Sequence, residues 1–129
     1  CLRALDADAA AVSVARENVT MNGVDGPVTV QHGTLPGGDA VPVHFLAEGG
    51  LDLLDTGQFT LILVNILAHV IVSLAPALSA RLAPGGTVIA AGLIDTQESL
   101  VTESFRTAGL HVVERAQEKD WVSLVARRR

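Results

Sequence analysis

The stretch of sequence that decides the fold is FTLILVNILA, residues Phe59 to Ala68. It begins as an unbroken apolar run rich in branched residues, which is typical of a strand in a parallel sheet that helices cover on both faces. The run then reaches a single amide, Asn65, after which apolar residues recur at helical intervals, at Ile66, Leu67, Val70, Ile71, Leu74 and Leu78. The pattern therefore predicts a strand that ends at Asn65 and a helix that follows it. In open α/β sheets, ligands bind at such carboxyl ends of strands.

A membrane-spanning helix is the alternative interpretation of this segment. Residues 56–80 contain no Asp, Glu, Lys or Arg, and the segment is long enough to cross a bilayer. Polar residues and a proline nevertheless interrupt the run, at Gln58, Asn65, His69, Ser73 and Pro76. The sequence Pro84-Gly85-Gly86 then ends it as a helix of a water-soluble protein would end. We therefore expect no association with a membrane.

Composition limits the classes of protein that fit. The chain has 129 residues, 49% hydrophobic and 18% charged, so we expect at most one domain, with a packed core. Its net charge of -5 argues against a nucleic-acid partner, which usually requires a basic surface. The single cysteine, Cys1, fits a reducing compartment and no signal peptide is recognisable, so we expect a cytoplasmic protein. Because the initiator Met is missing, we expect either a fragment or a chain that has lost upstream residues.

Alternation, periodicity and turn residues predict the elements outside the central stretch. Strands are expected at residues 1–6, 28–31, 87–93, 110–116 and 121–126, and helices at 9–21, from the central strand to about 82, and at 96–108. A capping box of Asp95 and Glu98 marks the start of the last helix. Residues 33–57 are loop-like, with a small element at 43–47. This order predicts an α/β fold with a doubly wound, mostly parallel sheet and a C-terminal antiparallel hairpin.

Asp6 is the first candidate site residue. A carboxylate at the tip of a strand can accept hydrogen bonds from both hydroxyls of a ribose, as in nucleotide-binding α/β folds. Alternatively, Asp6 caps the next helix or simply faces solvent. Asp8 is better placed to cap that helix, which would leave Asp6 free to bind a ligand.

Asn65 is the second candidate, because its side chain offers a carbonyl acceptor and an amide donor at the end of a buried strand. A substrate amine could donate a hydrogen bond to this carbonyl and keep its lone pair aimed at an electrophile. The alternative is a helix cap, a role that asparagine performs well. The residues alone leave both roles open.

Other kinds of site lack support in the sequence. The four histidines are scattered and have no cysteine partner, so we expect no metal site. No serine lies in a nucleophile-elbow setting, which argues against a hydrolase. No Gly-x-Gly motif follows a strand, so neither a phosphate-binding glycine loop nor a dehydrogenase-like nucleotide site is expected within the chain.

Several segments together resemble one family. Residues 4–8 (ALDAD), 14–18 (VAREN) and 22–24 (NGV) resemble the second strand and following helix of class I S-adenosylmethionine-dependent methyltransferases. Residues 64–68 (VNILA) resemble the Asn-Ile-Leu-Ala signature of the ribosomal protein L11 methyltransferase family. Residues 82–86, 92–94 and 121–127 resemble later segments of that family in the same order.

The resemblance implies a fold, a cofactor and an activity. The fold would be the Rossmann-like sheet of these methyltransferases, with residues 1–129 as a partial domain from its second strand to the C-terminus. Asp6 matches the acidic residue that holds the ribose of S-adenosylmethionine, and Asn65 matches the asparagine beside the methyl group and the target amine. Gly33 and Thr34 would lie near the adenine ring. The expected activity is methyl transfer to amino groups, the N-terminal amine and lysine side chains, of a large-subunit ribosomal protein.

The same resemblance implies that parts of the family pattern are missing. The first strand, its glycine-rich loop and a separate substrate-docking domain are expected before Cys1. Without that strand, two apolar sheet edges are unpaired, which favours a homodimer. We therefore expect this chain alone to be inactive, whereas its parent protein would be an enzyme. The alternative is a non-catalytic methyltransferase-fold remnant that acts as an interaction or dimerisation module.

Overall fold

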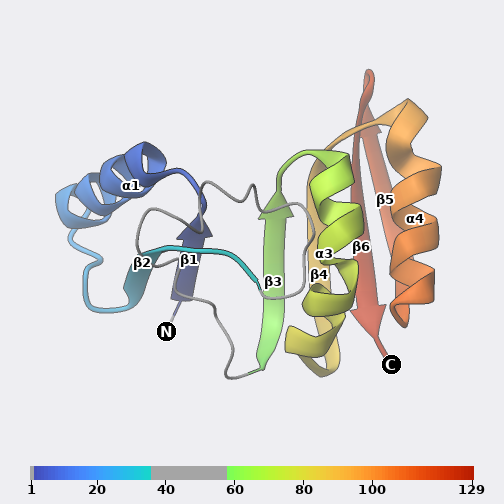
Figure 1. Ribbon diagram of the computed structural model, residues 1–129, viewed down its shortest axis with the longest axis horizontal. Coiled ribbons are helices and arrows are strands. Elements are labelled where there is room, and N and C mark those ends of the chain that lie inside the picture. The colour runs from blue at the N-terminus through green and yellow to red at the C-terminus, as the bar shows by residue number, and fades with distance from the viewer. Residues whose placement is uncertain (1, 36–57) are drawn as a thin grey trace. The chain divides into compact units, whose positions relative to one another are not determined.

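The computed structural model describes residues 2–35 and 58–129, and each of these two ranges belongs to a separate compact unit of the chain (Figure 1). The first unit contains β1 (Leu2–Asp6), α1 (Ala9–Met21) and β2 (Val28–His32). The second contains β3 (Phe59–Asn65), α3 (Ala68–Arg81), β4 (Leu82–Ile94), the short 3-10 helix η1 (Asp95–Gln97), α4 (Glu98–Thr107), β5 (Leu110–Glu118) and β6 (Trp121–Arg128). Cys1 and the element expected at 43–47 lie outside the described residues.

In the first unit, α1 packs on a parallel pair of strands. The register of β1 and β2 runs from Leu2 opposite Val28 to Asp6 opposite His32. Val12 of α1 and Val30 of β2 are the buried apolar residues in the described part of this unit. The helix also reaches the sheet through a polar contact, because the Arg16 guanidinium donates to the Val30 carbonyl from Nε at 3.2 Å and from Nη2 at 3.1 Å.

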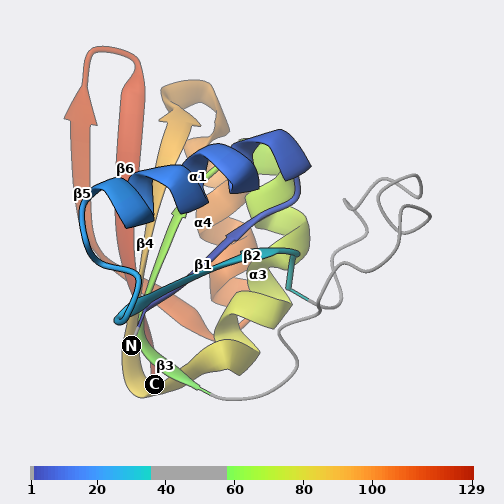
Figure 2. The ribbon, with the colours of Figure 1, turned by 90° about the vertical axis from the view of Figure 1, so that its left-hand side faces the viewer.

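In the second unit, two helices cover one face of a mixed sheet. The strand order is β3-β4-β6-β5, in which β3 and β4 are parallel while β6 runs antiparallel to both of its neighbours. Helices α3 and α4 lie side by side on the same face (Figure 2). The buried residues of β4 and β6 alternate with half-buried positions along most of each strand, as expected when the helices cover one face of the sheet. This core contains Ile71, Leu74, Leu78, Val88, Ala90, Leu93, Val101, Phe105, Leu110, Val122, Leu124 and Ala126.

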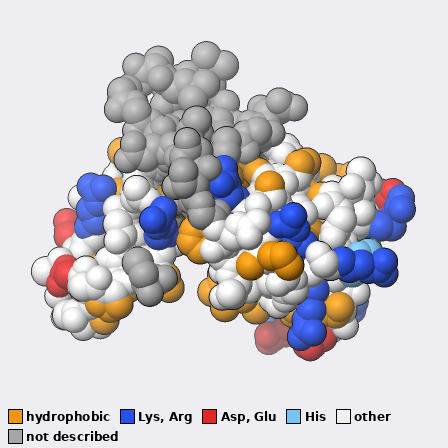
Figure 3. Space-filling view, turned by 90° about the horizontal axis from the view of Figure 1, so that it is seen from below, with side chains coloured by type: hydrophobic (Ala, Val, Ile, Leu, Met, Phe, Trp, Pro, Cys, Tyr) orange, Lys and Arg blue, Asp and Glu red, His pale blue; other side chains and the backbone are white. Residues whose placement is uncertain are grey.

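The strand β3 lies at an edge of its sheet and exposes apolar side chains. Leu61 is 51% exposed and Leu63 is 68% exposed. These residues alternate with Ile62 and Val64, which are half-buried, so the exposed side chains share one side of the strand. Hydrophobic side chains also reach the surface of this unit on the face drawn in Figure 3, where charged side chains lie between them.

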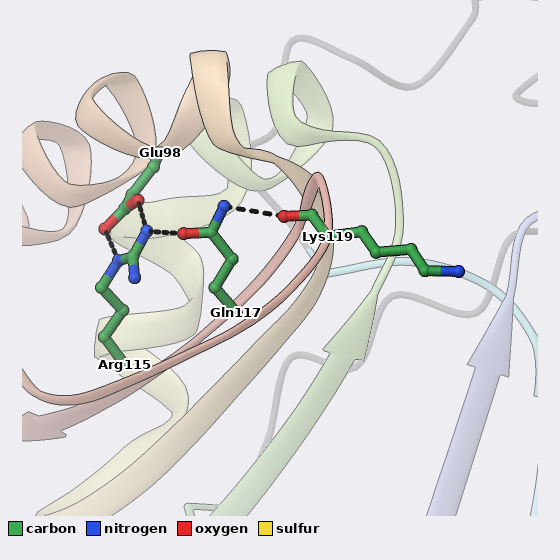
Figure 4. A network of polar contacts seen from close by, with 4 residues as sticks. All are labelled: Glu98, Arg115, Gln117 and Lys119. Atoms are coloured by element: carbon green, nitrogen blue, oxygen red, sulfur yellow. Dashed lines mark hydrogen bonds and ion pairs between the residues drawn. The ribbon is translucent and has the colours of Figure 1, made fainter.

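A polar network joins the start of α4 to the C-terminal hairpin (Figure 4). Arg115 on β5 holds Glu98 with two hydrogen bonds, from Nε to Oε1 at 2.6 Å and from Nη2 to Oε2 at 2.8 Å. Nη2 also donates to Oε1 of Gln117 at 2.6 Å, and Gln117 Nε2 donates to the Lys119 carbonyl at 2.8 Å. The Arg115 guanidinium holds the pKa of the Glu98 carboxyl below its usual range. The network therefore connects the helix to the hairpin turn at residues 119–120.

The predicted order of helices and strands is confirmed over the described residues. Two details of the prediction are wrong. First, β4 begins at Leu82, because Phe59 of β3 pairs with Leu82 and the register shifts before Leu61 pairs with Thr87. Second, the capping box at the last helix is absent: no side chain caps η1 or α4, and Glu98 binds Arg115 instead.

The described strands form two sheets, a parallel pair and a mixed sheet of four strands with the predicted antiparallel hairpin at its end. The additional first strand that the family resemblance places before Cys1 stays a prediction. Among the helices of residues 2–35 and 58–129, none has the length and apolar character needed to span a membrane.

Candidate functional site

The first part of the candidate site is the turn between β1 and α1. Asp6 is exposed at the end of β1, and its Oδ1 accepts a hydrogen bond from the backbone N–H of Asp8 at 2.8 Å. Asp8 in turn caps α1, because its Oδ1 accepts from the N–H of Ala10 at 2.8 Å. The prediction that Asp8 caps the helix is confirmed. The turn uses Oδ1 of Asp6 and fixes the direction of the carboxylate, while Oδ2 lies outside this hydrogen bond.

The end of β2 lies beside this turn. The Gly33 N–H donates to the Asp6 carbonyl at 3.0 Å, which extends the parallel ladder by one bond beyond the last pair. Gly33 is buried and Thr34 is half-buried. The structure thus brings Asp6, Gly33 and Thr34 to the same edge of the first unit, where the carboxyl ends of two parallel strands meet.

His32 also belongs to this edge, although its sequence context gave no reason to select it. Its Nε2 lies 2.9 Å from the Ala7 carbonyl oxygen, across the turn that holds Asp6. A carbonyl oxygen can only accept a hydrogen bond, so Nε2 carries the hydrogen in this contact. His32 therefore ties the end of β2 to the β1–α1 turn. The signal that could have found it is its place as the last residue of a strand parallel to β1.

The second part of the candidate site is the end of β3. Asn65 is the last residue of this strand, is exposed, and lies opposite Ala91 of β4. Helix α3 does not begin at Asn65: its cap residue is Leu67, whose carbonyl accepts from Val70 and Ile71 and which makes no side-chain cap bond. The alternative in which Asn65 caps the helix is therefore wrong. Its amide is available for another role at the carboxyl end of a strand.

Asp6 and Asn65 belong to different units of the chain. Their convergence on one ligand stays a prediction. Within residues 2–35 and 58–129, the structure contains no group of three His, Cys, Asp or Glu residues arranged to hold a metal ion. The chemistry of the described edges is instead that of hydrogen-bond acceptors and an amide, which suits a polar organic ligand.

Comparison with known proteins gives these strand ends a context. A family model described as "Ribosomal protein L11 methyltransferase (PrmA)" matches residues 2–129. The chain belongs to this family. The match includes both candidate strand ends, and it confirms the family resemblance found in the sequence.

A curated relative in the ribosomal protein L11 methyltransferase family comes from Chloroflexus aurantiacus. It is 41% identical to the chain over 133 residues, and the alignment covers 97% of the chain but 40% of the relative. A second relative, from Agrobacterium fabrum, is 37% identical over 127 residues, covering 97% of the chain and 39% of that protein. The chain thus spans about two fifths of the length of these relatives.

Solved structures confirm the Rossmann-like methyltransferase fold. The ribosomal protein L11 methylase from Lactobacillus delbrueckii subsp. bulgaricus superposes with a TM-score of 0.78 at 23% identity, covering 98% of this chain and 58% of that one. The N-methyltransferase NodS from Bradyrhizobium japonicum, solved with S-adenosyl-L-homocysteine, superposes with a TM-score of 0.62 at 15% identity, covering 98% of this chain and 65% of NodS. At these identities the likeness shows the fold alone.

Proposed function

We propose that the chain forms part of an S-adenosylmethionine-dependent methyltransferase that modifies amino groups of a large-subunit ribosomal protein. The observation that carries the proposal is the family match over residues 2–129, which includes a carboxylate and an amide at the carboxyl ends of β1 and β3. The targets would be the N-terminal amine and lysine side chains. A cytoplasmic location, where such a substrate is available, is part of the same proposal.

The first unit provides a plausible set of groups for the nucleoside of the cofactor. The exposed Asp6 carboxylate is already oriented by the Asp8 N–H, so it can accept from ribose hydroxyls with little loss of side-chain freedom. Gly33 and Thr34, at the end of β2, would contact the adenine ring. S-adenosylmethionine supplies a methyl group on a positively charged sulfur, which is the electrophile of the reaction. The complex of NodS with S-adenosyl-L-homocysteine supports this choice of cofactor for the fold.

Asn65 would orient the amine that receives the methyl group. Its carbonyl oxygen can accept a hydrogen bond from the neutral amine, which leaves the nitrogen lone pair free to point at the methyl carbon. Direct displacement needs these atoms in line, so correct placement supplies most of the rate enhancement. The side chain lies at an exposed strand end and is not used as a helix cap, as this role requires.

The test is a pair of substitutions in the whole protein. We expect Asp6→Ala to weaken S-adenosylmethionine binding about tenfold to a hundredfold, because hydrogen bonds to a charged group are lost. We expect Asn65→Ala to lower kcat about a hundredfold while cofactor affinity stays within about twofold, because only the amine is misplaced. Calorimetry with the cofactor and methyl transfer to a ribosomal protein measure the two effects.

Asp6→Asn and Asn65→Gln are the matched controls, since each keeps a carbonyl acceptor near the original position. Unchanged cofactor affinity in Asp6→Ala would remove Asp6 from the site. Equal methylation rates in Asn65→Ala and the native protein would remove Asn65 from the reaction.

A second candidate function is an interaction module that pairs with a second copy through its sheet edge. The exposed Leu61 and Leu63 on the edge strand β3 favour it, since an apolar edge promotes association. This candidate predicts self-association without cofactor binding, whereas the methyltransferase proposal requires cofactor binding by the whole protein.

A further inference from the structure

Gly92 occupies a bulge in β4, close to the strand end that carries Asn65. Ala90 pairs with Leu124 and Leu93 pairs with Val122, so β4 advances three residues while β6 advances two. Gly92 has a φ of +78°, in the left-handed region that favours glycine. One extra residue and a left-handed glycine define a bulge that bends the strand locally.

The bulge keeps the side chains of β4 before and after Gly92 on the same, buried face of the sheet. Ala90 is fully buried and so is Leu93, although an unbroken strand would turn these two residues to opposite faces. Because Gly92 takes up the extra step, Leu93 points into the same core as Ala90 and Val122. The glycine conformation therefore has a structural purpose.

The side chain of Asn65 occupies the space above Gly92. A Cβ atom built in ideal geometry on Gly92 would lie 2.6 Å from Oδ1 of Asn65, closer than real Cβ atoms approach an oxygen. Its other neighbours, the carbonyl oxygen and the nitrogen of Ile66, would lie at ordinary distances of 3.4 and 3.7 Å. The conflict would thus involve the Asn65 amide specifically.

The other glycines with a left-handed backbone lack such a neighbour. At Gly23, Gly85 and Gly109, a Cβ atom would meet nothing within 4 Å in the described part of the chain. Gly109 has a φ of +80°, nearly the same as that of Gly92, and it belongs to the same unit. Gly92 and Gly109 therefore share the backbone requirement and differ in the contact with Asn65.

We propose that Gly92 is a positioning residue for Asn65: its missing side chain leaves the space in which the Asn65 amide lies at the end of β3. The role of that amide in the reaction rests on the proposed function. A side chain at position 92 would move Oδ1 of Asn65 rather than the backbone, because the amide ends a short rotatable side chain while β4 is held by strands on both sides. The carbonyl would then no longer present its acceptor to the target amine.

The first test needs no substrate. In the full chain, Gly92→Ala and Gly109→Ala carry the same backbone strain, so both are expected to lose stability to a similar extent. NMR of the side-chain amide groups then separates them. We expect the Asn65 Nδ2 resonance to shift in Gly92→Ala and to keep its native position in Gly109→Ala. A resonance that stays in place in both variants would overturn the proposal.

The second test is turnover in the whole protein. Gly92→Ala is expected to lower kcat about a hundredfold with cofactor affinity unchanged, as Asn65→Ala does, while Gly109→Ala keeps the native kcat. In the Asn65→Ala background, Gly92→Ala should cause little further loss, because two substitutions that disable one group are not additive. A further loss as large as in the native background would contradict the proposal.

Folding failure of Gly92→Ala is also informative. If Gly92→Ala fails to fold while Gly109→Ala folds, the 2.6 Å contact with Oδ1 of Asn65 is the difference between them, and the double variant Asn65→Ala, Gly92→Ala, which removes Oδ1, should fold. Failure of both variants would overturn the proposal in favour of backbone strain alone. If the Asn65 resonance shifts but kcat is unchanged, the positioning stands and the catalytic role of Asn65 fails, so the two ideas are tested separately.

Discussion

The turn after β1 shows how two carboxylates two residues apart divide their roles. Asp8 uses Oδ1 to accept the Ala10 N–H at the start of α1, and Asp6 uses Oδ1 to accept the N–H of Asp8. Each side chain thereby satisfies a backbone donor that the helix itself leaves without a partner. Because Asp8 performs the capping, Asp6 needs only one oxygen for the turn and can offer the other to a ligand.

This division predicts the effect of Asp8→Ala. Loss of the cap should lower the stability of α1 by about 1 kcal/mol, since the Ala10 N–H loses its acceptor. Hydrogen exchange of the α1 amides measures the change. Asp8→Asn keeps a capping oxygen and should retain native protection; equal protection in Asp8→Ala and the native chain would show that this bond contributes nothing.

At the scale of elements, the contact between α4 and β5 is the clearest polar junction. Glu98 and Arg115 are 17 residues apart and form a two-bond ion pair, with side chains 24% and 44% exposed. Glu103 and Arg106 form a more exposed pair within α4, with side chains 61% and 68% exposed. Exposed pairs within one helix contribute little, so the pair between elements should matter more.

The Glu98 pair predicts a dependence of stability on pH. Its hydrogen bonds with Arg115 lower the pKa of Glu98 in the folded state, so the charged carboxylate favours folding. This contribution is fully present above the ordinary pKa of 4.5 and is lost as the pH falls through the lowered value. We expect the difference in urea midpoint between the native chain and Glu98→Gln to close on acidification.

Glu103→Gln is the comparison for this experiment, because it removes a carboxylate of α4 that pairs within the helix. It should change the midpoint less than Glu98→Gln at neutral pH. A difference for Glu98→Gln that is the same at neutral and acidic pH would exclude the ion pair as its cause.

The contact between α4 and β5 also shows which features of the fold short sequence patterns predict and which they do not. The extent of α1 and the end of β3 at Asn65 follow from local patterns, and the structure confirms both. The spacing of Asp95 and Glu98 also looked like a local signal, but Glu98 bonds to Arg115, which the fold brings next to it. Long-range partners therefore override a local capping pattern, and no short sequence window contains that information.

The residues of the candidate site also differ in whether the sequence alone reveals them. Asp6 and Asn65 could be selected because each ends an apolar strand. Gly92 and His32 could not, because their contacts with Asn65 and Ala7 depend on a bulge and on the register between parallel strands. Both features arise when strands pair, so they become visible only in three dimensions.

At the scale of the whole molecule, the two units differ in how much core they possess. Val12 and Val30 are the buried apolar residues of the described part of the first unit, whereas the second contains a continuous core beneath α3 and α4. Since buried apolar area supplies most of the folding free energy, the second unit should be the more stable. It also has the apolar edge strand β3, so association should depend on this unit.

We expect the chain to self-associate through β3, and Leu63→Lys to reduce this association. Leu63 is 68% exposed, and a lysine on an edge strand opposes pairing with a second strand. Sedimentation velocity over a range of concentrations measures the effect. Leu100→Lys is the control, because it replaces a leucine 55% exposed on α4 and leaves the edge intact. A native chain that is monomeric throughout would contradict the expectation.

The bulge in β4 also limits how the length of the gene can change. An in-frame loss of codon 92 would remove the extra residue between Ala90 and Leu93, so Leu93 would follow Ala90 by two residues and face the same core without a bulge. Leu93, now fully buried, would stay inward, and Ile94, now 42% exposed, would stay outward just before the chain enters η1. Single-codon deletions in β4 should therefore be tolerated more readily at codon 92 than elsewhere in the strand, where they would exchange its inner and outer sides.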